Sequence, residues 1–67
     1  MSKVEFEDCS CSFDKEKAAL VLIPDWSEDE PLWIPKSVIH DDSEVWKAGT
    51  DGILVLMDWW AKKEGLI

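Results

Sequence analysis

The feature that most limits the fold is a run of six apolar residues, Ala18 to Ile23, that stops at Pro24. The run is too short for a typical helix, and proline cannot continue one, so the pattern predicts a strand. Because the run has no polar face, we expect a central strand that is covered on both sides.

The segment before this run predicts a second strand with a bulge. Val4 and Phe6 alternate with charged residues, and the apolar positions then shift phase so that Cys9 continues the pattern. A one-residue shift within a strand is what a bulge near residues 7–8 produces. The polar residues 14–17 predict a hairpin loop between the two strands.

The second half predicts shorter elements. Residues 32–34 lie between two prolines, which favours a strand at the edge of the sheet. Residues 36–40 fit either one helical turn or extended chain. A turn with glycines at 49 and 52 separates residues 44–47 from 53–57, and this pattern predicts a hairpin.

The last segment predicts a helix over residues 58–64, with an acid in its first turn, two lysines in its last, and Gly65 and Leu66 as the cap. A helix this short needs tertiary support, so we expect Trp59 or Trp60 to dock on the sheet. The fold class is α+β: a small antiparallel sheet of four to five short strands with one short C-terminal helix. Its 67 residues make a single domain, 1–67.

Charge limits the function. The chain has 15 acidic residues against 7 lysines, no arginine, and a net charge of -8. This balance argues against direct nucleic-acid binding and favours a basic protein partner. The alternative is that the acidity serves only solubility. The regular apolar pattern excludes a disordered chain.

The reactive side chains do not form a recognisable catalytic or metal motif. Cys9 and Cys11 share one face of a strand, too close in sequence for an unstrained disulfide, so we expect reduced thiols. A metal would need two further ligands, and His40 is the only histidine. His40 and Asp41 are adjacent, and adjacent side chains rarely converge on one substrate. We expect no enzyme activity, cofactor or metal.

The first residues lack a signal peptide's basic start and apolar block, and no run reaches membrane-spanning length. We therefore expect a cytosolic protein with no membrane contact, and we also expect a monomer. The five tryptophans lack the cationic groove that base stacking requires. We expect Trp33, Trp46 and Trp59 mostly in the core, and Trp26 exposed as an interface anchor.

The carboxylates gather in an acidic loop, residues 25–30, and a second acidic cluster, residues 41–44. We expect both on one side of the domain, away from the helix. On a strand, Glu5 and Glu7 lie about 6.6–6.8 Å apart, roughly twice the 3.4 Å spacing of phosphates along one DNA strand. A solvated acidic face would look the same in sequence. The predicted partner-binding residues are Glu5, Glu7, Asp25, Trp26, Glu28, Asp29, Glu30, Asp41, Asp42 and Glu44.

Four strings of the second half resemble small uncharacterised proteins of phages and prophages. Those proteins share a Trp-Ile/Leu-Pro-Lys-Ser string and a closing Glu-Trp-x-Ala-x-x-Lys-Gly-Leu helix; here Asp58 replaces the glutamate and a second tryptophan is inserted. The resemblance covers residues 33–66, about half of the chain. The strings are Trp33-Ile34-Pro35-Lys36-Ser37, residues 40–46, residues 52–56 and residues 58–66.

Size, acidity and the implied phage origin also resemble anti-CRISPR inhibitors that mimic DNA. This resemblance implies a phage-encoded acidic inhibitor that binds a basic DNA-binding surface of a host defence complex, namely the type I CRISPR surveillance complex, Cascade. The alternative is an accessory protein-binding module of a phage replication or recombination cluster. That module would use an aromatic interface built from Trp26 and residues 33–37.

Overall fold

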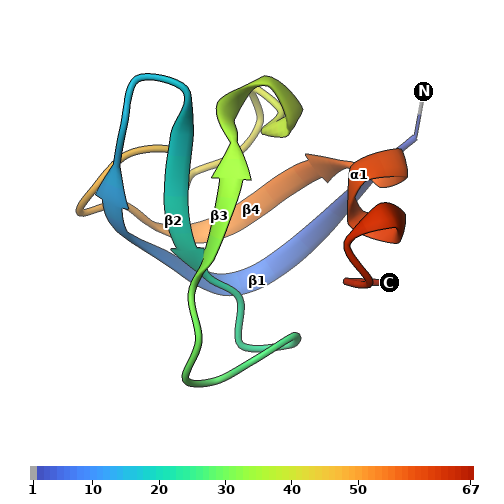
Figure 1. Cartoon of the computed structure of the whole chain (residues 1–67), viewed down its shortest axis with the longest axis horizontal. Coiled ribbons are helices and arrows are strands. Elements are labelled where there is room, and N and C mark those ends of the chain that lie inside the picture. Colours follow the sequence, from blue (N-terminus) through green and yellow to red (C-terminus); the bar gives the residue numbers. More distant parts are fainter. Residues whose placement is uncertain (1) are drawn as a thin grey trace.

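One antiparallel four-stranded sheet with the strand order β3-β2-β1-β4 forms the body of the protein (Figure 1). The computed structural model describes residues 2–67, and a short helix follows the last strand. This architecture confirms the α+β prediction. The elements are β1 (Lys3–Asp14), β2 (Ala18–Leu22), β3 (Leu32–Pro35), the 3-10 turn η1 (Lys36–Val38), β4 (Asp51–Met57) and α1 (Asp58–Lys63).

Strand β1 pairs along both of its edges and bends between its two partners. Its first part pairs with β4 and its end pairs with β2. The register with β4 shifts between Phe6 and Cys9, where Asp8 has a φ of 59°, so the predicted bulge is confirmed. A second shift lies between Cys11 and Phe13, which the sequence pattern did not signal. Bulges increase local twist, and here they allow one strand to serve two neighbours.

The outer edge of β4 is covered by residues 39–44, which makes the sheet a partly closed barrel. Ile39 bridges Leu56, and the backbone N–H of His40 donates to the carbonyl of Val55 at 2.8 Å. The Ser43 hydroxyl then accepts from the Val55 N–H at 2.8 Å and lies 2.9 Å from its carbonyl oxygen. The chain that leaves β3 through η1 thereby covers the outer edge of β4, at the other side of the sheet.

The predicted hairpin between residues 44–47 and 53–57 is wrong. Residues 44–47 form bends rather than a strand, and β4 pairs with β1 instead. Side chains accept the outward N–H groups of β4: the Ser43 hydroxyl accepts that of Val55, and the Glu44 carboxylate accepts that of Ile53 at 3.0 Å. The carbonyls of the same two residues accept the backbone N–H groups of His40 and Glu44. A regular strand is not needed to satisfy that edge.

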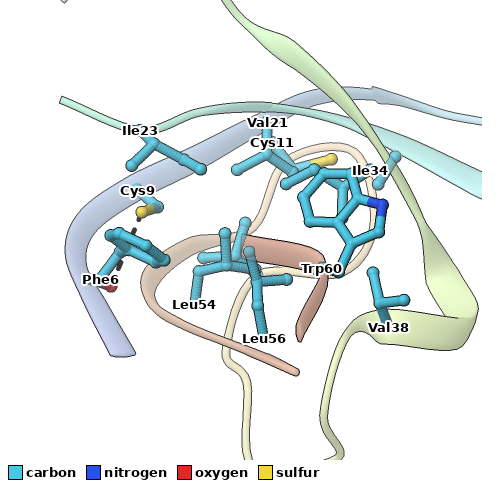
Figure 2. Packing of buried hydrophobic residues seen from close by; sticks show 12 residues of the cluster. Phe6, Cys9, Cys11, Val21, Ile23, Ile34, Val38, Leu54, Leu56 and Trp60 are labelled. Carbon is cyan, nitrogen blue, oxygen red and sulfur yellow. Dashed lines mark hydrogen bonds between the residues drawn. The ribbon is translucent and has the colours of Figure 1, made fainter. Parts of the chain in front are cut away.

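The core lies between the inner face of the sheet and α1. Figure 2 shows the indole of Trp60 entering the aliphatic cluster on the side of Ile34 and Val38. Trp60 is 6% exposed, whereas Trp59 is 49% exposed, so Trp60 is the residue that docks the helix. The cap is as predicted: Gly65 has a φ of 77°, and the Leu66 N–H donates to the carbonyl of Ala61 at 2.8 Å.

Strand β2 is covered on one face only, so the prediction of a strand covered on both sides is wrong. Ala19, Val21 and Ile23 point into the core, while the alternate residues Leu20 and Leu22 are only partly buried. The single helix explains this difference, because α1 contacts mainly β4 and β1 and places Trp60 on the inner side. The outer face of β2 has no helix left to cover it.

Cys9 and Cys11 are both buried, and neither forms a disulfide. The Sγ of Cys9 lies 3.6 Å from the carbonyl oxygen of Phe6, a contact drawn as a dashed line in Figure 2. Burial, with a smaller contribution from Asp25, raises the pKa of the Cys9 thiol to about 11. The folded protein therefore favours the neutral thiol.

This pKa predicts a loss of stability at high pH. The thiol's contribution is fully present below its unfolded pKa of about 9 and is lost as the pH rises towards 11, with a total of about 2–3 kcal/mol. Urea unfolding between pH 8 and 11 measures this slope. Cys9→Ala should show a shallower decrease than the wild type; identical slopes would contradict the assignment to Cys9.

The two adjacent tryptophans of α1 predict opposite mutational effects. Trp60→Ala should remove about 3–5 kcal/mol, which is close to the whole stability of a domain this small, so the variant should be largely unfolded. Trp59→Ala should change the unfolding free energy by no more than about 0.5 kcal/mol. Far-UV circular dichroism with thermal unfolding compares the two; equal losses would contradict the proposed docking of Trp60.

Candidate functional site

Four of the five tryptophans are exposed on the surface. The prediction that three of them lie mostly in the core is wrong, since their exposed fractions are 42% for Trp33, 49% for Trp46 and 49% for Trp59. The exposure of Trp26 is confirmed at 38%, although it is the least exposed of the four. Aliphatic residues and Trp60 fill the small core, so the other indoles have no interior site.

An apolar row crosses three strands on the outer face of the sheet. Phe13 lies opposite Leu20, and Leu20 lies opposite Trp33, so the three side chains project from the same face. The rings of Phe13 and Trp33 meet edge to face, with centroids 6.4 Å apart and an interplanar angle of 81°. Leu20 is partly buried beside them. We call Phe13, Leu20 and Trp33 the outer patch.

A lysine lies over one ring of the outer patch. The Nζ of Lys15 is 5.1 Å from the ring centroid of Trp33, within the range of a cation–π contact. Lys15 belongs to the β1–β2 hairpin, where its backbone N–H donates to the carbonyl of Ala18 at 2.7 Å. A second pair of the same kind joins Lys47 and Trp46, also at 5.1 Å.

Ion pairs engage three further lysines. The backbone N–H of Ala48 donates to Asp14, Lys36 lies 3.0 Å from the same carboxylate, and these two contacts, in that order, lower the pKa of Asp14. Lys3 lies 2.8 Å from Asp42 and lowers the pKa of that carboxyl in the same way. Lys62 lies 3.8 Å from Asp58. With the two lysines over tryptophan rings, five of the seven lysines have a partner.

All ten residues of the predicted partner-binding set are exposed. They do not form one array, because the acidic loop precedes β3 and the second acidic cluster follows it, at opposite ends of the strand (Figure 1). The four residues of β3 span about 13 Å at roughly 3.3 Å per residue. The expectation of one shared side is therefore wrong.

Local contacts further divide the acidic residues. Asp42 is paired with Lys3 and lies 3.4 Å from the Nδ1 of His40, and Glu44 turns its carboxylate towards β4. The acidic loop differs, because Glu28, Asp29 and Glu30 are exposed and none makes an ion pair within residues 2–67. Of the two clusters, the acidic loop therefore has more carboxylates that are free to contact a partner.

A groove of about 320 Å³ lies beside η1, and the sequence did not predict it. His40 forms part of its wall and accepts the backbone N–H of Asp42 through Nδ1 at 3.0 Å. The groove joins residues that are up to ten positions apart, so no local pattern marks it. Its lining residues are Lys36, Ile39, His40, Asp41, Ser43 and Trp46.

Comparison with known proteins finds no matching family model, no matching curated protein and no matching solved structure. The resemblance to phage proteins therefore stays a prediction. Within residues 2–67, no helix has the length and apolar character needed to cross a membrane, and no cluster of three potential metal ligands is found. The outer patch and the acidic loop are the surfaces on which a functional proposal can be based.

Proposed function

We propose that this chain is a protein-binding module without catalytic activity that docks on its partner through the outer patch. The observation that carries this proposal is the exposed row of Phe13 and Trp33 packed beside Leu20 across three strands. Aromatic side chains that are rigidly held on a surface are common anchors of protein interfaces. The sequence suggested an aromatic interface built from Trp26 and residues 33–37, and the interface proposed here is centred on Trp33.

The edge of β3 supports docking on the face of the sheet rather than strand addition. The N–H of Lys36 donates to the carbonyl of Lys17 at 2.8 Å, and in an antiparallel pair every second residue forms such hydrogen bonds with the neighbouring strand. The N–H of Trp33, three positions before Lys36, therefore points away from β2. Pro31 and Pro35, two positions away on either side, have no N–H to offer. A strand added by a partner would find only the backbone N–H of Trp33 as a hydrogen-bond donor between residues 31 and 35 of this edge.

The proposal predicts that changes to the outer patch abolish binding without unfolding the protein. Affinity capture from cells that express the chain should recover a partner with the wild type and lose it with Phe13→Ser/Trp33→Ser. Trp59→Ser is the control, because Trp59 is similarly exposed but lies outside the outer patch. An apolar interface should also persist in 0.5 M salt.

A partner that the double variant retains, with its circular dichroism spectrum unchanged, would contradict the outer patch as the docking surface. Loss of the same partner in the Trp59→Ser control would do so too.

A second candidate function is an acidic inhibitor of a DNA-binding protein, the type I CRISPR surveillance complex in a host cytosol. The carboxylates of Glu28, Asp29 and Glu30 favour it, because they are exposed and make no ion pair within residues 2–67. A short loop with three adjacent negative charges can occupy a cationic DNA channel in the way that phosphates do. This candidate uses the acidic loop as a small contact, since the second acidic cluster lies at the other end of β3.

The second candidate predicts salt-sensitive competition with DNA. The purified protein should block binding of target DNA by a type I CRISPR complex, and inhibition should fall steeply between 50 and 200 mM salt. Reversal of the loop charges, Glu28→Lys/Asp29→Lys/Glu30→Lys, should remove it, whereas Phe13→Ser/Trp33→Ser should not. The absence of competition at low salt would exclude this candidate and leave the outer patch proposal untouched.

A further inference from the structure

We infer that the partner of the outer patch presents a cationic side chain, preferably arginine, that stacks on Trp33 in the place now held by Lys15. This inference rests on the proposed function and names the chemistry of its partner. It follows from two features of the surface, a ring with a cation over its face and a cation that is easily displaced, and from the net negative charge of the protein.

The contacts of Trp33 define a site with an apolar wall and a cation-accepting face. Phe13 meets Trp33 edge to face at 6.4 Å, and the Nζ of Lys15 lies 5.1 Å from the ring centroid. The indole nevertheless remains 42% exposed. The ring can therefore accept a partner side chain if Lys15 swings away from it.

Lys15 is held weakly. Its side chain is exposed on a hairpin loop, and it makes no ion pair among the described residues. An ammonium on an exposed ring is a weak contact, whereas a guanidinium is planar, less strongly hydrated and stacks on the indole face. An incoming arginine therefore exchanges a weak contact within the chain for a better one at the interface.

The charge of the protein selects a basic partner. The net charge is -8, and three of the seven lysines are already paired with carboxylates of the chain. The acidic loop ends at Glu30 and precedes β3, the strand that carries this ring. A segment with alternating apolar and basic residues would complement both the outer patch and the net charge of the protein.

The experiment uses the indole N–H signals of the ¹⁵N-labelled full chain, of which there are five, one for each tryptophan. The probe is a ten-residue peptide of alternating leucine and arginine; the reference peptide carries neutral citrulline at every arginine position. The arginine peptide should shift the Trp33 signal and leave the Trp59 signal in place. Trp33→Leu should weaken its binding at least fivefold.

The decisive variant is Lys15→Ala, which should bind the arginine peptide about two- to fivefold more tightly than the matched control Lys17→Ala. Both variants remove one positive charge from the same hairpin, so long-range electrostatics cancel in the comparison. Lys47→Ala, which frees Trp46 instead of Trp33, should behave like Lys17→Ala.

The alternative outcomes separate the inference from the proposed function. If Lys15→Ala binds no more tightly than Lys17→Ala, or if the citrulline peptide shifts Trp33 equally well, the exchange of cations is wrong while the apolar docking face stands. If the arginine peptide moves signals elsewhere but not that of Trp33, the cation site is overturned. Retention of the captured partner by Phe13→Ser/Trp33→Ser overturns the docking face itself.

Discussion

Backbone pairing of β1 on both of its edges holds this small sheet together. The first part of the strand pairs with β4 and its end pairs with β2. The two bulges bend the strand so that it can pair with both neighbours. Everything else is attached to that frame: β3 extends it beyond β2, residues 39–44 close it against β4, and α1 covers the inner side. With 67 residues, the chain buries a smaller share of its surface on folding than a larger domain does.

Apolar side chains remain exposed on the outer face of the sheet because, within residues 2–67, only one short helix covers the sheet, and it covers the inner face. A single helix of six residues inserts Trp60 on the inner side of the sheet, and no other described helix is available for the outer side. Leu20 is partly buried and lies between its cross-strand neighbours, Phe13 and Trp33. The same side chains that protect the strand form an apolar surface, which is why the protein's packing and its proposed binding are linked.

Lysines and carboxylates form separate pairwise contacts rather than one network. Lys36 and Lys3 form ion pairs with Asp14 and Asp42, and Lys15 and Lys47 lie over indole rings. The negative charge that remains is spread over both ends of β3 rather than gathered on one side. The acidic loop precedes β3, the strand that carries Trp33 of the outer patch.

The sequence alone determined the local features: the strands around residues 3–14 and 18–22, the bulge at Asp8, the edge strand between two prolines, and the capped helix. Each depends on neighbours within a few positions, so periodicity and turn chemistry suffice. Tertiary structure alone decided which tryptophan is buried, that β4 pairs with β1, that the acidic clusters separate, and that a groove and an outer patch form. These outcomes depend on strand order and on how many elements compete to cover a face, and residues far apart in the chain set both.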